Sequence, residues 1–369
     1  MRILINLSNI RIGGGVQVAL SFLGQLSNFT SKHTFRVVVS EQISKNIPDI
    51  VFSDKSIIFY KYTLKPTIVK AYSGKDTFLN KVLSDNKCDK AFTLFGPSYW
   101  RPSVPHLVGF ARPHYVYNDS PFFKQIGFIE RLFWMFSEII HMYSFNQHSD
   151  SLVTENEHVS SKISLRLRKP VFTVSNTFHQ VYDDESLWQI PEVDFEVSTN
   201  YVLTISANYA HKNLSIIPKI VEELLSRNFT NIKFILSINK GEISSSEIID
   251  EYIIYLGPIS IEKCPLLYSN SDIVLLPSLL ECFSATYAEA MKMRRALITS
   301  DLPFARGICK DAALYVNPIN ASEIANCIIN LLSDQSIMNN IIDNGNKCLS
   351  TFLSPRSRAE KYIEIVENL

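Results

Sequence analysis

The sequence lacks a long apolar run and a surplus of charge, and each absence excludes a class of protein. No stretch of about 18 uncharged apolar residues is present, so no membrane-spanning helix is predicted. Lysine plus arginine equals aspartate plus glutamate at 36 each, so no global positive field favours nucleic acid. The strand pattern Arg2–Leu7 begins at once, which predicts no signal peptide. We therefore expect a cytoplasmic protein without a nucleic-acid partner.

Cysteine is also sparse, and its spacing excludes two further classes. The six cysteines form no CxxC pair and have no metal-ligand spacing, so neither a structural metal site nor a disulfide framework is expected. They are predicted to be small buried residues in a reducing compartment. What is abundant is apolar sequence, 46% of 369 residues, which is enough for two domains with sizeable cores.

Strand and helix patterns alternate along the first half of the chain. Strands are predicted at residues 2–7, 35–39, 56–60, 90–94, 106–110, 151–154 and 171–174. Helices are predicted at residues 16–26, 122–145 and 158–168. This alternation predicts a parallel sheet with helices on both faces.

A polar and acidic segment, Asp183–Asn200, interrupts the pattern and predicts a linker or the entry to a second domain. Strands are then predicted at residues 201–205, 233–237, 253–256, 272–276, 296–299 and 314–316. Helices are predicted at residues 214–227, 261–269, 321–332, 337–349 and 356–367, and one beginning near Ala285. We therefore predict an α/β protein with two doubly wound parallel-sheet domains, residues 1–180 and 181–354.

The segment Asp272–Ser300 carries the most chemical information. Two glutamates, Glu281 and Glu289, lie between two buried-strand patterns, with seven residues separating them. Ser284 can cap the helix near Ala285, which places Glu281 in a loop and Glu289 about one turn inside the helix. The loop follows a strand and precedes a helix, where α/β proteins bind ligands. Helix amides that bind anions, beside carboxylates that accept hydrogen bonds from hydroxyls, fit a nucleotide sugar.

This segment resembles the E-x7-E signature of retaining glycosyltransferases of the GT-B fold, family GT4. The signature reads Glu281-Cys282-Phe283-Ser284, four residues, then Glu289, with Cys282 and Ser284 in place of the family's glycines. The resemblance implies two Rossmann-like domains facing a central cleft, with residues 355–369 packing back on the N-terminal, acceptor-binding domain. It implies that Glu281 contacts the donor sugar, that Glu289 contacts the ribose, and that Cys282, Phe283 and Ser284 line the donor site. It also implies a UDP- or GDP-linked sugar as substrate, with no metal and no cofactor.

A second signal, Tyr201–Asn213, ends a strand and begins a helix. Lys212 would face the Glu281 loop and stabilise the negative charge of a leaving nucleoside diphosphate. A cation is an unusual choice at a helix N-terminus, which favours an anionic partner over an ordinary solvated lysine. The arginine that GT4 enzymes carry five or six residues earlier is absent. Asn208 and His211 are candidate polar contacts to the donor.

Two loops of the first half supply further candidates. Gly13-Gly14-Gly15 follows the first strand, and Gly14 and Gly15 allow close approach of the donor phosphates, although a plain tight turn explains them equally well. The family places an active-site histidine near the reacting sugar. In the segment Gly109–Asp119, two residues could take its place, and His114 ranks above Arg112. His106 lies inside a strand and is expected to be structural. Asn176 resembles an asparagine that the family has at the domain hinge.

The predicted helix 122–145 is crowded with aromatic residues and carries few charges. Core packing is the expected explanation, and an interfacial helix at a membrane is the alternative. Few lysines accompany it, which argues against strong electrostatic membrane binding.

The leading hypothesis is a hexosyltransferase that moves sugar from a nucleotide donor to an oligosaccharide acceptor carried on a polyprenyl lipid. The chain is rich in tyrosine, asparagine, serine and isoleucine and poor in glycine, and this composition favours a role in O-antigen or capsule biosynthesis. Peripheral contact at the inner face of the cytoplasmic membrane is expected with that role. One alternative is a sugar-nucleotide epimerase with the GT-B fold, against which the paired glutamates argue. The other is a non-catalytic, glycosyltransferase-like binding subunit.

Overall fold

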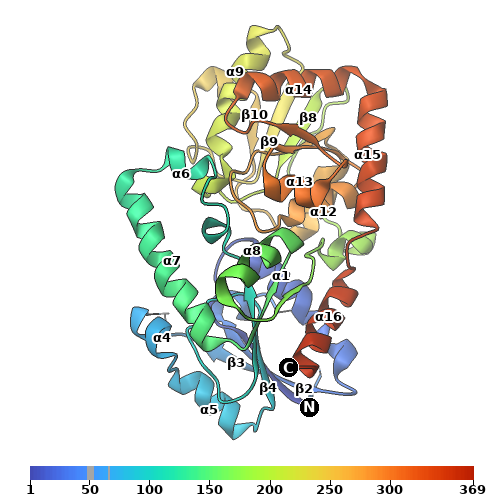
Figure 1. Ribbon diagram of the computed structural model, residues 1–369. Coiled ribbons are helices and arrows are strands. Elements are labelled where there is room, and N and C mark those ends of the chain that lie inside the picture. The colour runs from blue at the N-terminus through green and yellow to red at the C-terminus, as the bar shows by residue number, and fades with distance from the viewer. Residues whose placement is uncertain (48–53, 65–66) are drawn as a thin grey trace. The chain divides into compact units, whose positions relative to one another are not determined.

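A computed structural model describes residues 1–47, 54–64 and 67–369, which form two compact units (Figure 1). The N-terminal unit comprises Met1–Asp119, Phe123–His179 and Leu353–Leu369, and the C-terminal unit comprises Ser120–Phe122 and Gln180–Phe352. Each unit is built on its own parallel sheet.

The N-terminal unit has a seven-stranded parallel sheet with the order β3-β2-β1-β4-β5-β6-β7. Its strands are β1 (Arg2–Leu7), β2 (Thr34–Ser40), β3 (Ile57–Tyr62), β4 (Lys90–Thr93), β5 (His106–Phe110), β6 (Ser151–Thr154) and β7 (Val171–Thr173). All seven lie within a residue or two of the predicted strands, because each is a short apolar run.

The helices of this unit differ more from prediction. They are α1 (Gly14–Leu23), α2 (Glu41–Ser44), α4 (Ile68–Ser73), α5 (Thr77–Asp85), α7 (Phe128–His148), α8 (Glu157–Leu167) and α16 (Pro355–Glu367). The prediction of one helix over 122–145 is wrong, since α6 (Phe122–Gln125) ends before Gly127, whose extended backbone (ψ 161°) breaks the helix.

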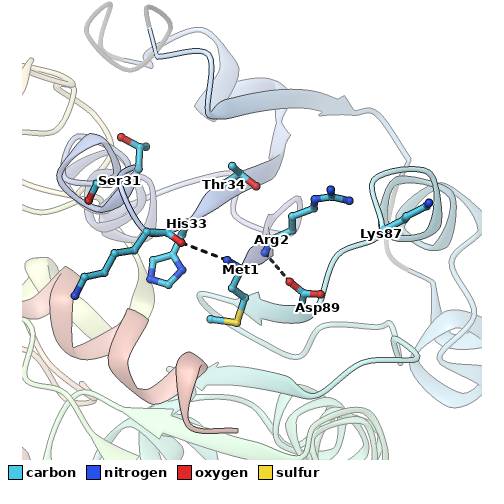
Figure 2. A pocket seen from close by; sticks show the side chains of 9 residues that line it. Met1, Arg2, Ser31, His33, Thr34, Lys87 and Asp89 are labelled. Carbon is cyan, nitrogen blue, oxygen red and sulfur yellow. Dashed lines mark hydrogen bonds between the residues drawn. The ribbon is translucent and has the colours of Figure 1, made fainter.

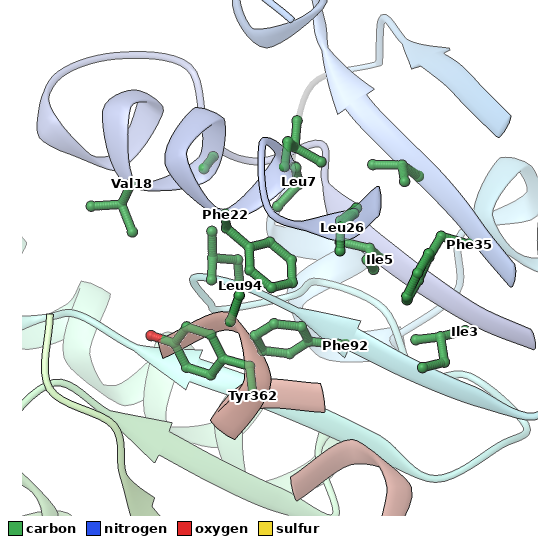
Figure 3. Packing of buried hydrophobic residues seen from close by; sticks show 14 of the residues in the cluster. Ile3, Ile5, Leu7, Val18, Phe22, Leu26, Phe35, Phe92, Leu94 and Tyr362 are labelled. Carbon is green, nitrogen blue, oxygen red and sulfur yellow. The ribbon is translucent and has the colours of Figure 1, made fainter. Parts of the chain in front are cut away.

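The C-terminal helix α16 contributes to the N-terminal core (Figure 3). The ring of Tyr362 packs against Phe22, with centroids 5.8 Å apart, and against Phe92 at 5.2 Å. One turn earlier, the buried guanidinium of Arg358 donates to Asn176 Oδ1 and, at 2.9 Å, to Ser21 Oγ. Asn176 is therefore a hydrogen-bond partner of α16.

The C-terminal unit has a six-stranded parallel sheet with the order β10-β9-β8-β11-β12-β13. Its strands are β8 (Asn200–Thr204), β9 (Ile232–Leu236), β10 (Ile253–Tyr255), β11 (Ile273–Leu276), β12 (Ala296–Ser300) and β13 (Leu314–Val316). Its helices are α9 (Ile217–Ser226), α10 (Glu247–Asp250), α11 (Cys264–Ser269), α12 (Ala285–Lys292), α13 (Pro303–Cys309), α14 (Ala321–Ser333) and α15 (Gln335–Leu349).

The direction of strand succession reverses between β8 and β11, which are hydrogen-bonded neighbours. The loops that leave the carboxyl ends of these two strands therefore begin side by side, and such a switch point is where open α/β sheets bind ligands. The loop after β8 carries Lys212 and the loop after β11 carries Glu281.

Candidate active site

Lys212 and Glu281 form an ion pair at the switch point of the C-terminal sheet. Lys212 ends the short 3₁₀ turn η5 (Ala210–Lys212), and Glu281 lies in the loop between β11 and α12. Lys212 Nζ donates to Glu281 Oε1, and the two side chains are only 16% and 8% exposed. An ammonium and a carboxylate are thus held together in a space from which water is largely excluded.

The local setting of Lys212 corrects one step of the sequence argument. Lys212 was expected at the N-terminus of an α-helix, but α9 begins only at Ile217, after a further 3₁₀ turn, η6 (Leu214–Ile216). The argument from a cation at the N-terminus of an α-helix therefore does not apply to Lys212, and its contact with the donor diphosphate stays a prediction. The ion pair with Glu281 explains why a lysine is stable in this half-buried position.

Asn213 fixes the loop that carries Lys212. Its backbone is left-handed, with φ 58°, a conformation that asparagine tolerates better than most residues. Its buried side-chain amide donates to the carbonyls of Pro277 (3.3 Å) and Pro318 (2.7 Å). One side chain thereby joins the loops that follow β8, β11 and β13. Asn213 was not among the predicted site residues, because nothing in the neighbouring sequence reveals these distant partners.

Glu289 lies on α12 and is buried. Its carboxylate accepts a hydrogen bond from the hydroxyl of Tyr268, on α11, at 2.8 Å. Burial raises the pKa of Glu289 to about 7, because desolvation of the carboxylate outweighs the stabilising hydrogen bond. The side chain therefore changes charge near neutral pH.

This shift predicts a pH-dependent stability for the C-terminal unit. A carboxyl group whose folded pKa exceeds its unfolded value favours the folded state at low pH and loses that advantage as pH rises. We expect Glu289→Gln, which cannot ionise, to gain stability relative to the wild type as the pH rises from 4.5, the ordinary pKa of a glutamate, to about 7. The gain should total roughly 3 kcal/mol. Urea unfolding of both proteins at pH 4, 6 and 8 measures it, and a constant difference across these pH values would contradict the assignment.

The residues between the glutamates are enclosed by protein. Cys282, Phe283 and Ser284 are buried, and the ring of Phe283 packs edge-on against Phe352, with centroids 5.7 Å apart. Helix α12 begins at Ala285 as predicted, but the Ser284 side chain makes no capping hydrogen bond. The Ser284 carbonyl instead accepts from the amide of Tyr287 at 3.2 Å.

The other two candidates of this unit lie in the loop after β8. Asn208 is exposed and donates to the carbonyl of Glu242 at 2.7 Å. The ring of His211 stacks on the ring of Tyr209. The backbone carbonyl of His211 accepts a hydrogen bond from the amide of Leu279 at 2.7 Å. Burial and the neighbouring Lys212 lower the pKa of His211 to about 3, so its imidazole is neutral at pH 7.

The remaining candidates belong to the N-terminal unit. A Cβ at Gly14 would meet no heavy atom within 4 Å, whereas one at Gly15 would touch Ile10 at 3.5 Å. Gly13 is the glycine that the turn requires, because its φ is 70°. His114 is buried in the 3₁₀ turn η2 (Pro113–Tyr115) after β5, and its ring stacks on Trp134 at 3.8 Å.

His106 is a structural residue, as expected. Its Nδ1 is 2.7 Å from the carbonyl of His148, and its Nε2 is 2.8 Å from Thr93 Oγ1. Full burial lowers the pKa of His106 to about 4, so it stays neutral inside the sheet.

Figure 2 shows a surface pocket of about 520 Å³ in the N-terminal unit, at the amino ends of β1 and β2. Arg2 and Asp89 line it and are joined by a 2.8 Å hydrogen bond from the Arg2 amide to the Asp89 carboxylate. It contains none of the predicted site residues. Among the described residues, no group of three or more histidine, cysteine or acidic side chains is arranged to hold a metal ion.

Comparison with known proteins identifies the C-terminal unit. Residues 189–348 match the family described as glycosyl transferases group 1. The C-terminal unit is a group 1 glycosyltransferase domain. The O-antigen chain mannosyltransferase RfbU of Salmonella typhimurium is 26% identical over 137 residues, which span 36% of this chain and 38% of the length of that relative.

Solved structures that resemble the whole chain establish its fold. WaaG, a glycosyltransferase involved in lipopolysaccharide biosynthesis, has a TM-score of 0.70 at 12% identity, covering 99% of both chains. Anabaena Alr3699/HepE, solved in complex with UDP and glucose, has a TM-score of 0.69 at 13% identity, covering 100% of both. The predicted family and GT-B fold are confirmed, and the group 1 domain supports the predicted enzyme class, glycosyltransferase.

Proposed function

We propose that this protein is a retaining hexosyltransferase that uses a nucleotide sugar as donor and a lipid-linked saccharide as acceptor. The observation that carries the proposal is the enclosed Lys212–Glu281 ion pair at the switch point of a group 1 glycosyltransferase domain. RfbU is an O-antigen chain mannosyltransferase, and WaaG is a glycosyltransferase involved in lipopolysaccharide biosynthesis. Their similarity to this chain supports a cell-surface polysaccharide as the product.

Each site residue has a task that its chemistry fits. The amides of the first turn of α12 bind the donor diphosphate, with the positive end of the helix dipole behind them. The Lys212 ammonium neutralises charge that develops on the leaving diphosphate, and Glu281 accepts hydrogen bonds from sugar hydroxyls. Glu289 accepts a hydrogen bond from the ribose.

Gly14, Gly15 and His114 are the residues of the N-terminal unit to which the proposal gives a role, and this unit binds the acceptor. Both the turn at Gly14 and the turn at His114 follow a strand of the N-terminal sheet at its carboxyl end. The proposal requires no metal, because Lys212 and the α12 amides carry the diphosphate charge. Turnover is therefore expected to be unchanged by EDTA.

A donor screen tests the proposed reaction. The protein is incubated with UDP- and GDP-linked hexoses, with and without polyprenyl-diphosphate oligosaccharides, and nucleotide release is measured. We expect one donor to be consumed and the new linkage to keep the anomeric configuration of that donor by NMR. Consumption of no donor would overturn the transferase proposal, and donor binding without turnover would identify a non-catalytic subunit. Conversion of the donor to an epimeric nucleotide sugar would identify an epimerase.

A further inference from the structure

Helix α7 turns its apolar face outward, contrary to the expectation of core packing. Seven large apolar side chains on it are between 38% and 84% exposed. They are Phe128, Ile129, Phe133, Met135, Phe136, Ile139 and Tyr143. At 100° per residue these positions fall on one side of the helix, whereas a surface helix normally turns such a stripe to the core.

The opposite side of α7 makes the contacts with protein. Met142, Phe145 and His148 are buried, and Trp134 stacks on His114. The charged residues also lie off the exposed face, since Glu138 pairs with Arg166 at 2.5 Å and Glu130 and Arg131 fall on the flanks. The exposed face therefore carries no charge between Phe128 and Tyr143.

Helix α4 extends this face. Ile68, Val69 and Tyr72 are each more than 70% exposed, and α4 lies beside α7 (Figure 1). The rings of Tyr72 and Tyr143 stack at 5.1 Å. We call the seven residues of α7 together with these three the apolar face. Ten large apolar side chains are exposed side by side on this face, and a contiguous apolar patch of this kind marks an interaction surface.

A basic pocket adjoins the apolar face at the C-terminal end of α7. It has a volume of about 460 Å³ and is lined by Met142, Tyr143 and Asn146 of α7 and by Leu167 of α8. Three cationic residues, one at the end of α8 and two just after it, complete the lining. These cations are Arg166, Arg168 and Lys169. Arg168 is exposed and forms no side-chain hydrogen bond or ion pair with any residue the structure describes. Tyr143 belongs to both the apolar face and the pocket, so the two are continuous.

We infer that the apolar face is the docking surface for an anionic phospholipid membrane, with the basic pocket holding a lipid phosphate. An amphiphile with an anionic head and an apolar tail matches both features, and aromatic residues are favoured at the membrane interface. A second copy of the chain fits less well. Antiparallel pairing of two α7 helices would bring the basic pocket toward the partner's α6–α7 junction, where Lys124 and Arg131 outnumber Glu130. No helix among the described residues is long and apolar enough to cross a membrane.

Vesicle sedimentation with a matched pair of variants tests the apolar face. Ile129 and Ile139 are 84% and 66% exposed on α7, and Ile190 and Ile248, on the C-terminal unit, are 83% and 67% exposed. We expect wild type to sediment with vesicles of equimolar phosphatidylcholine and phosphatidylglycerol. Ile129→Ser/Ile139→Ser should weaken this binding by about tenfold or more, because two buried side chains are lost from the lipid. Ile190→Ser/Ile248→Ser should bind as wild type.

A second pair of variants tests the basic pocket. Arg168→Gln should weaken binding to the mixed vesicles about fivefold, the worth of one cation near an anionic surface, without changing binding to pure phosphatidylcholine. Arg294→Gln is the control, since Arg294 is also exposed and also has a positive φ. The inference is overturned if wild type does not sediment with anionic vesicles or if Ile129→Ser/Ile139→Ser binds them as wild type. It is equally overturned if that variant instead dissociates a dimer in lipid-free sedimentation velocity. None of these residues belongs to the proposed reaction site, so failure here leaves the proposed function standing.

Discussion

Replacing Lys212 with methionine is expected to lower sugar transfer by at least about a hundredfold, the usual cost of removing one preorganised group that stabilises developing charge. Methionine keeps the unbranched shape of the lysine stem and removes only the ammonium. The loss should appear mainly in kcat, because the charge on the leaving diphosphate is largest in the transition state. Steady-state kinetics with the donor found in the screen measures it.

The control for this variant must separate chemistry from folding. Lys212→Met leaves the buried Glu281 carboxylate without its partner, which by itself destabilises the loop. The double variant Lys212→Met/Glu281→Gln removes that unpaired charge and should recover the thermal stability without recovering activity. Lys292→Met removes another ion-paired lysine, whose partner is Asp183, from the far end of α12 and should keep full activity. Transfer by Lys212→Met within a few-fold of wild type would show that the proposed site is wrong.

The sequence predicted the strands well and the short helices poorly, for a physical reason. The central strands of both sheets are buried on both faces, and each is therefore a short apolar run in the sequence. Helices α4 and α5 were missed, since α4 has only six residues and exposes its apolar side chains. The start of α5 did carry a signal, because the Asp76 side chain accepts a hydrogen bond from the amide of Leu79 at 3.0 Å, as an N-cap does.

The contacts of the candidate site likewise fall into those that the sequence predicts and those that it does not. Lys212 and Glu281 each follow a strand, and neighbouring parallel strands bring the loops at their carboxyl ends together, so their proximity could be predicted from topology alone. Tyr268 and Glu289 are 21 positions apart in the sequence, and the hydrogen bond between them depends on how α11 and α12 pack. No local pattern encodes that packing, and the raised pKa of Glu289 follows from it.

The sequence also does not predict which side of α7 faces the protein. The aromatic residues on helix 122–145 identify an amphipathic helix, but periodicity does not say which side meets the protein. The stacking of Trp134 on His114 and the ion pair of Glu138 with Arg166 settle this by holding the other side against the N-terminal unit. The less favoured alternative in the sequence, an interfacial helix, is the one that the exposed side chains support.

Replacing Arg358 with alanine is expected to lower the free energy of unfolding by about 3 kcal/mol or more, because a large buried side chain is lost and its cavity remains. The guanidinium is fully buried, and burial lowers the pKa of Arg358. Its loss also leaves Ser21 Oγ and Asn176 Oδ1 without their arginine donor. Urea unfolding measures the change, and Arg356→Ala, an exposed arginine on the same helix, should differ from wild type by less than about 0.5 kcal/mol.

A third variant separates the two causes of this loss. Arg358→Met retains most of the aliphatic volume but none of the hydrogen bonds, so its stability reports packing alone. If Arg358→Met recovers most of the loss, α16 is held mainly by packing around Tyr362 and Phe22. If it recovers little, the hydrogen bonds to Asn176 and Ser21 hold the C-terminal helix in the N-terminal core. Wild-type stability for Arg358→Ala would contradict both explanations, because it would mean that neither the packing nor the hydrogen bonds of Arg358 stabilise the N-terminal unit.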